Sequence, residues 1–285
     1  MHPAAIGLIL LSAVAHVFWN YQVKRSARPA IYTWWLLVIG AGLVAPVAVW
    51  LAWPVSVPAA GWYCVAGTGF FYAGYYGFIA RSYEQSDLSR AYPIARGVAP
   101  VATAALGVLF HRETPSLAGW LGISGVSLGV LALAWPAMGG GKALSSNGLL
   151  AAVATGLCTS GYSAVDKEGV QHVHPALYIV LTFAVGALAL GVQLCRRHRW
   201  EAFAEEFAGG RGRLFAAAAV AISGYLLVLT VLRTEPVSYV VPLRSVSVPL
   251  SVLAGSQMLG ERQALPRFAA ATLILLGITS IVLGG

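Results

Sequence analysis

Charged residues are scarce in this chain. They make up only 10% of its 285 residues, and just 10 residues are acidic, whereas an average soluble domain carries roughly 25% charge. Hydrophobic residues reach 58%, and the mean hydropathy is +0.75. A chain so poor in charge predicts an all-α integral membrane protein, and ten spanning segments with short turns would leave no room for a soluble domain.

Cysteine and metal-ligand patterns are equally sparse. Cys64, Cys158 and Cys195 are odd in number, widely spaced and embedded in apolar runs, so neither a disulfide framework nor a metal site is indicated. His172 and His174 form an HxH pair. A metal site would need further ligands nearby, so a solvated turn is favoured there. We expect no metal and no cofactor.

The net charge of +8 could indicate nucleic-acid binding. The basic residues, however, lie in short loops between apolar segments, where cytoplasmic lysine and arginine of a membrane protein are expected. Nucleic acid is therefore not an expected partner. The expected partners are the lipid bilayer and a small-molecule substrate. The sequence does not set the oligomeric state, and a monomer is taken as the working state.

Ten apolar segments can be placed, each close to the roughly 20 residues that span a bilayer core of about 30 Å. The N-terminal run lacks a preceding basic region, so it is interpreted as the first spanning helix and not as a cleaved signal. The predicted spans are about 3–23, 31–52, 61–82, 89–110, 117–136, 148–167, 175–195, 213–233, 237–259 and 265–284.

The chain repeats itself. Pro93 and Pro100 are matched by Pro242 and Pro249 at one constant offset, and Gly74-Tyr75 is matched by Gly224-Tyr225. Five spans per repeat is an odd number, so the repeats enter the membrane from opposite sides. The prediction is two inverted five-helix repeats around a central cavity, with the binding site between the halves. The predicted boundaries are residues 1–137 and 148–285, joined by a glycine-rich linker at 138–147.

Lysine and arginine counts predict the orientation. Thirteen of the 18 basic residues lie in the loops after spans one, three, five, seven and nine, and only three lie in loops on the other side. By the positive-inside rule, the basic side faces the cytoplasm of a plasma (inner) membrane and both termini lie outside. In the long loop after span seven, Trp200, Phe203 and Phe207 at helical spacing favour a short interfacial helix, with a solvated loop as the alternative.

Two arginines stand inside predicted spans. Arg96 and Arg244 each cost roughly 2.5–3.5 kcal/mol at the centre of a spanning helix, and every acidic residue is placed in a loop or at a span end. Pro100 removes a donor and frees the carbonyl of Arg96, and Pro249 does the same for Ser245. We interpret these positions as lining a hydrated translocation path. The alternative is that each arginine snorkels or bonds to freed carbonyls and hydroxyls.

Other polar side chains follow the same helix faces. Tyr92 lies near the Arg96 face, and Ser247 lies three residues after Arg244. The third span carries a tyrosine stripe, which suits either an amphipathic solute or helix packing. The candidate substrate-binding residues are Tyr72, Tyr76, Tyr92, Arg96, Tyr225, Arg244, Ser245 and Ser247, and the candidate hinge residues are Pro93, Pro100, Pro242 and Pro249.

A proton-coupling residue is not evident. His16 could titrate on the path, but a lone histidine in an apolar helix is more often a hydrogen-bonded packing residue. With no carboxylate predicted at mid-membrane, we expect transport to depend only weakly on a proton gradient.

The two repeat ends, a proline-bearing span finishing in HRE or GER and then a glycine-rich closing helix, resemble the drug/metabolite transporter superfamily in its ten-helix EamA-type branch. The resemblance covers the whole chain. It implies a cavity lined mainly by spans three, four, eight and nine, and export of small metabolites, with YddG-like amino-acid exporters as the nearest subgroup.

The expected function is a secondary transporter that exports neutral or zwitterionic amino acids by alternating access. An uncoupled facilitator or channel is the first alternative. An intramembrane enzyme is the second. Against it, the sequence has no HExxH, no nucleotide-binding glycine loop and no intramembrane carboxylate pair or Ser-His dyad at helical spacing, so we expect no enzymatic activity.

Overall fold

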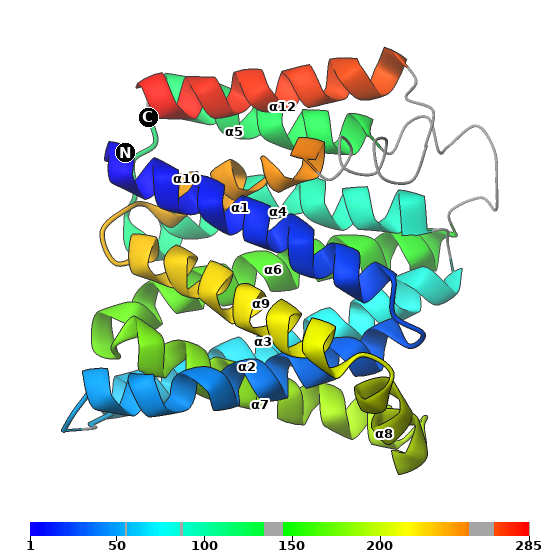
Figure 1. Ribbon diagram of the computed structural model, residues 1–285. Coiled ribbons are helices and arrows are strands. Elements are labelled where there is room, and N and C mark those ends of the chain that lie inside the picture. Colours follow the sequence, from blue (N-terminus) through cyan, green and yellow to red (C-terminus); the bar gives the residue numbers. More distant parts are fainter. Residues whose placement is uncertain (55, 86–87, 134–144, 251–264, 285) are drawn as a thin grey trace. The chain divides into compact units, whose positions relative to one another are not determined.

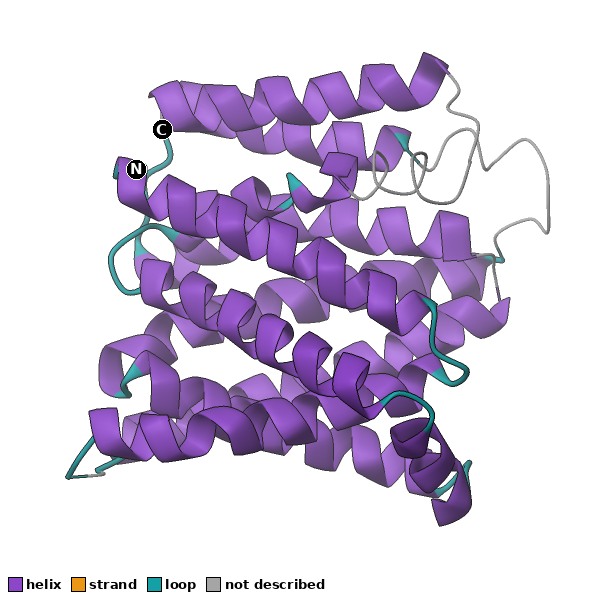
Figure 2. Ribbon diagram, in the orientation of Figure 1, coloured by secondary structure: helices purple, strands orange, loops and turns teal. Residues whose placement is uncertain are grey.

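The computed structural model describes residues 1–54, 56–85, 88–133, 145–250 and 265–284. In these ranges every regular element is a helix (Figure 2), which confirms the all-α prediction. The helices, labelled in Figure 1, are α1 (Pro3–Lys24), α2 (Pro29–Leu51), α3 (Ala59–Gln85), α4 (Leu88–His111), α5 (Leu117–Ala132), α6 (Ser146–His172), α7 (Pro175–Cys195), α8 (Trp200–Ala208), α9 (Arg211–Leu232), α10 (Val237–Arg244) and α12 (Leu265–Gly284).

Six of these helices, α1, α2, α4, α6, α7 and α9, are long and apolar enough to cross a membrane. Shorter apolar helices lie at Leu117–Ala132, Val237–Leu250 and Ala269–Gly284. The third predicted span coincides with α3. With α3 included, the described residues contain a helix at each of the ten predicted positions.

The chain forms two compact units. Unit 1 comprises Met1–Leu10, Gly74–Ala164 and Thr234–Gly285, and unit 2 comprises Leu11–Ala73 and Val165–Arg233. Each unit draws helices from both halves of the sequence. Equivalent helices of the two repeats pair within a unit, α5 with α12 in unit 1 and α2 with α7 in unit 2.

Glycines bring α5 and α12 into backbone contact in unit 1 (Figure 1). A Cβ added to Gly122 would lie 2.5 Å from the Gly277 carbonyl oxygen, and one added to Gly129 would lie 2.9 Å from that of Ala270. Small residues at this spacing let two helices pack closely in a bilayer. The GxxxG of Gly125 and Gly129 is thus part of a helix-packing face.

The ninth predicted span is not one continuous helix. α10 ends at Arg244, a turn covers Ser245 and Val246, and helix resumes at Ser247. The Ser245 carbonyl accepts the Val248 N–H at 2.9 Å, so the prediction that Pro249 leaves this carbonyl without a donor is wrong. Pro249 has no N–H to offer Ser245, and a tighter i+3 bond replaces the missing one. Residues 251–259 of the span lie outside the described residues.

A carboxylate between α4 and α5 of the first repeat caps a helix of the second repeat within unit 1. Arg112 adopts a left-handed conformation with φ of 54° just after α4. The next residue, Glu113, then accepts the N–H of Val237 on Oε1 at 2.7 Å and that of Ser238 on Oε2 at 3.0 Å. A carboxylate at the first turn satisfies donors that have no partner inside the helix and complements the helix dipole.

Glu113→Ala should therefore destabilise the folded protein by about 1–2 kcal/mol, the usual cost of losing a helix cap. Thermal or denaturant unfolding of the purified protein in detergent measures this change. Glu201→Ala is the matched control, because Glu201 is exposed on α8 and its carboxylate lies 3.6 Å from exposed Arg199. Equal stabilities for the two variants would contradict a capping role.

Candidate functional site

Arg96 and Arg244 line the same small cavity in unit 1. Its volume is about 20 Å³, and it lies among α4, α6 and α10 with the turn that follows it. The lining residues are Arg96, Ala99, Pro100, Thr159, Ser163, Val241, Arg244, Ser245, Ser247 and Val248. The structure thus brings together four of the predicted substrate-binding residues and one predicted hinge proline.

Local packing sets the positions of these side chains. On α6, Gly156 allows close approach to α4, since an added Cβ would lie 2.6 Å from the Ala95 carbonyl oxygen. One turn later, the Ser160 hydroxyl donates to the Ala99 carbonyl at 3.0 Å. This contact fixes the α4 turn that carries Arg96. Arg244 closes α10 at the point where the helix breaks.

The cavity is polar and carries positive charge. Two guanidinium side chains line it, together with two hydroxyl residues of α6 and two that follow α10, and the lining residues include no acid. A volume of about 20 Å³ holds about one water molecule, whereas small-molecule sites usually measure about 300–1,000 Å³. The cavity must widen before it can admit a metabolite.

Two lining residues, Thr159 and Ser163, were missed by sequence reasoning. They follow Thr155 at four-residue intervals, so the three hydroxyls lie on one stripe of α6. Thr159 and Ser163 each donate to the backbone carbonyl one turn earlier, at 3.1 and 2.8 Å. This polar stripe in an apolar helix was the signal that could have revealed them.

The other predicted site residues are distributed between the units. The side chains of Tyr92 and Pro93 lie outside the described residues. Pro242 and Pro249 are buried beside the break in unit 1. Tyr76, also in unit 1, packs edge-on against Tyr75 with ring centroids 5.3 Å apart.

Tyr72 and Tyr225 belong to unit 2. The Tyr72 ring packs over Gly186, where an added Cβ would come within 2.9 Å of it. The Tyr225 ring stacks on Phe183 at a centroid distance of 6.4 Å. None of these contacts tests a role in substrate binding.

A buried carboxylate in unit 2 is the main feature that sequence reasoning missed. Asp166 is 0% exposed, and the hydroxyls of Thr68 and Tyr178 donate to its Oδ1 at 2.6 and 2.9 Å. The Tyr225 hydroxyl donates to Oδ2. These groups come from α3, α6, α7 and α9, so one carboxylate joins four helices.

Asp166 corrects the prediction that every acidic residue lies in a loop or at a span end. The sequence DKE at the predicted end of span six has the polarity of a loop, but α6 continues to His172. The ammonium of the neighbouring Lys167 donates to the Leu232 carbonyl at 2.8 Å. An ionisable residue buried in a spanning helix is by default a candidate functional residue.

Three of the histidines make contacts within a few residues of their own positions. The His16 ring contacts Trp19 edge-on at 5.0 Å. His172 lies 2.8 Å from Glu168, one turn earlier on α6, and the His174 side chain caps the N-terminus of α7 by accepting the Ala176 N–H.

Comparison with known proteins identifies the class. The model of the EamA-like transporter family matches the chain twice, at residues 3–135 and 146–283. The chain belongs to the EamA-like transporter family, and it is a multi-pass membrane protein with two inverted repeats. Membership of this family also supports the prediction that the protein transports small solutes and is not an enzyme.

Solved structures share the fold. One crystal structure aligns with a TM-score of 0.76 at 18% identity, covering 98% of this chain and 99% of that one. At this identity the likeness concerns the fold alone. No curated protein matches the chain.

Proposed function

We propose that this protein is a secondary transporter that exports neutral or zwitterionic amino acids, or similar carboxylate-bearing metabolites, by alternating access. The observation that carries the proposal is the cavity shared by Arg96 and Arg244. Two guanidinium groups beside serine and threonine hydroxyls form a site suited to a carboxylate, which arginine binds through two parallel hydrogen bonds.

The size and the backbone of this cavity support alternating access. With room for about one water, it has to open to bind a metabolite. The helix break after Arg244, which lies beside the buried Pro242 and Pro249, supplies interrupted backbone at the site. Discontinuous helices of this kind commonly form the substrate sites of transporters built from inverted repeats.

Counterflow in proteoliposomes tests the function. Vesicles preloaded with a neutral amino acid should take up and transiently concentrate the labelled amino acid from outside, because a carrier exchanges its substrate whereas a channel only equilibrates it. The methyl ester of the same amino acid should not exchange, since its carboxylate is blocked. Equal exchange of acid and ester would contradict carboxylate recognition, and equilibration without concentration would favour a channel.

We further propose that the protein lies in the plasma (inner) membrane with both termini outside. In a Cys195→Ser background, which removes the exposed native thiol, Ser145→Cys and His198→Cys should resist an impermeant maleimide in intact cells. Ser56→Cys, on the opposite side, should be labelled. All three positions should react after permeabilisation, which serves as the control, and the reverse pattern in intact cells would refute this orientation.

A further inference from the structure

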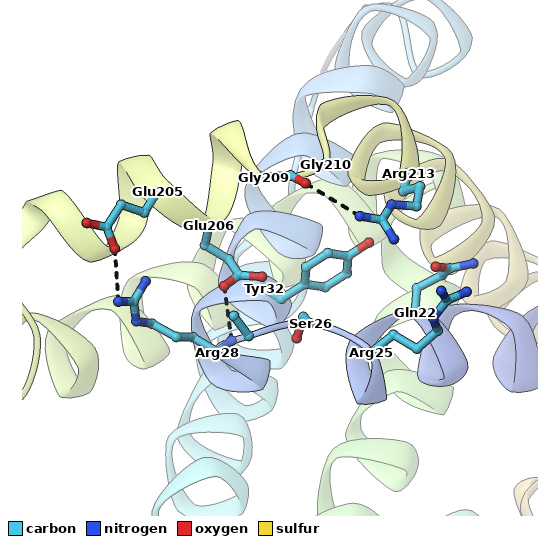
Figure 3. Close-up of a pocket in the computed structure, with 11 residues that line it drawn as sticks. Gln22, Arg25, Ser26, Arg28, Tyr32, Glu205, Glu206, Gly209, Gly210 and Arg213 are labelled. Atoms are coloured by element: carbon cyan, nitrogen blue, oxygen red, sulfur yellow. Dashed lines mark hydrogen bonds and ion pairs between the residues drawn. The ribbon is translucent and has the colours of Figure 1, made fainter. Parts of the chain in front are cut away.

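Unit 2 contains a second and larger pocket, which shares no residue with the arginine cavity. Its volume is about 570 Å³, and it lies between the turn joining α1 to α2 and the turn joining α8 to α9 (Figure 3). The residues that line it include Gln22, Arg25, Tyr32, Gly209, Gly210 and Arg213. This volume falls within the usual range of about 300–1,000 Å³ for small-molecule sites.

The acidic residues of the pocket are engaged by one arginine. Glu205 Oε2 lies 2.9 Å from Arg28 Nη2, and Glu206 Oε2 accepts the Arg28 backbone N–H at 3.0 Å. Arg25 and Arg213 have no carboxylate partner in the part of the chain that the structure describes. Their polar contacts, to the Tyr21 hydroxyl at 3.5 Å and the Gly209 carbonyl at 3.4 Å, are long. Two guanidinium groups are therefore able to bind an anion.

Tyr32 is a second, independent indication of a ligand. Its side chain is only 6% exposed, and its hydroxyl has no hydrogen-bond partner among the described residues. Figure 3 shows the ring inside the pocket with the hydroxyl directed toward the Arg213 side chain. Buried hydroxyls in folded proteins nearly always have a partner, and an ordered ion is one way to supply it.

The backbone adds donors to the same place. α9 begins at Arg211, and its N-cap, Gly210, provides no side-chain cap. The first N–H groups of a helix have no partner within the helix, and the positive end of the helix dipole favours an anion there. Guanidinium groups, a phenol and a helix N-terminus thus converge on one pocket.

The surroundings of this pocket are typical of a membrane surface. It lies at the ends of α1, α2 and α9, three helices long and apolar enough to span the bilayer. Beside it, Phe203 of α8 is buried, and Trp200, which is 62% exposed, stacks on it. Exposed tryptophan is typical of the headgroup level, where lipid phosphates are concentrated.

We propose that this pocket is a phosphate-binding site, which Arg25, Arg213, Tyr32 and the N-terminus of α9 form for a phosphate group at the membrane surface. The phosphate belongs either to the headgroup of an anionic phospholipid or to a free phosphate ion. In both cases the donors are the same, so the two sources are separated by experiment.

The test titrates the full-length protein, purified in detergent, with three probes: dioctanoyl phosphatidylglycerol, dioctanoylglycerol and inorganic phosphate. The melting temperature is recorded at each concentration. Phosphatidylglycerol should raise it saturably, and dioctanoylglycerol, which has the same chains without phosphate, should not. A saturable effect of inorganic phosphate as well assigns the site to phosphate itself, and its absence assigns the site to a lipid headgroup.

Variants locate the binding. Arg25→Gln combined with Arg213→Gln should raise the apparent Kd at least tenfold, whereas the control Arg199→Gln, at an exposed position outside the pocket, should change it less than twofold. If the double variant does not fold, Tyr32→Phe provides the test. Without ligand it should be as stable as the wild type, because it removes an unsatisfied hydroxyl, and it should bind severalfold more weakly. Unchanged affinity in Tyr32→Phe or in a folded double variant, or no saturable effect of either phosphate-bearing probe, overturns the proposal.

Discussion

Arg96→Gln and Arg244→Gln are each expected to lower the rate of zwitterion exchange by about ten- to a hundredfold. Both side chains line one cavity, where a carboxylate would form charge-assisted hydrogen bonds worth roughly 1.5–3 kcal/mol. Glutamine keeps hydrogen-bonding capacity and removes the charge, so the loss reports the value of the positive potential. Initial rates of counterflow in proteoliposomes, normalised to the amount of inserted protein, provide the measurement.

Two further substitutions sharpen this test. Arg96→Lys should restore little activity, because lysine keeps the charge but lacks the planar fork that matches a carboxylate. Arg233→Gln is the control, since it removes one charge at an exposed position after α9. If the Arg96 and Arg244 variants insert normally and transport at the control rate, the alternative that these arginines serve packing replaces the substrate-contact hypothesis.

Asp166→Ala is expected to cause the largest loss of stability, about 3–5 kcal/mol. It leaves the hydroxyls of Thr68, Tyr178 and Tyr225 without their shared acceptor, and a hydrogen bond to a charged group contributes about 1.5–3 kcal/mol. Unfolding in detergent measures the loss. Glu168→Ala is the matched control, because this exposed carboxylate lies on the same helix. A loss below about 1 kcal/mol for Asp166→Ala would mean that the carboxylate does not hold the four helices together.

Asp166 also changes the expectation for proton coupling. The weak dependence predicted from the sequence rested on the absence of a carboxylate at mid-membrane, and it did not take account of a carboxylate buried within a spanning helix, as Asp166 is. Buried ionisable residues in transporters often belong to proton relays. We now expect transport to respond to an imposed proton gradient and Asp166→Asn to remove the response while retaining exchange. A response that persists in Asp166→Asn would exclude this residue as the proton carrier.

The fold could be predicted because it follows from the composition of the chain, the length of its apolar runs and the spacing of its repeats. Apolar runs of spanning length fixed the helices, and the repeated prolines led to Arg96 and Arg244 without any structural information. These two arginines line one cavity with Ser245 and Ser247, whereas the predicted Tyr72 and Tyr225 belong to the other unit. Substrate contact by these residues stays a prediction.

The missed features depend on tertiary contacts. DKE has the polarity of a loop end. The burial of Asp166 is stabilised by hydroxyls from three other helices, which donate hydrogen bonds to its carboxylate. The break after Arg244 depends on an i+3 bond that Val248 makes in place of the donor missing from Pro249. Neither the partner helices nor the choice of turn can be identified from the residues alone.

The contacts between the repeats have a consequence for biosynthesis. A ribosome completes α5 and Glu113 before α10 and α12 are made, so the glycine face of α5 first meets lipid and the Glu113 carboxylate first meets water. Close glycine packing and the helix cap become available only when the last helices insert. A nascent chain that stops before residue 234 lacks three of the helical segments that complete unit 1. We expect such a product to be degraded by membrane quality control, because the glycine face of α5 and the Glu113 carboxylate would lack their partners.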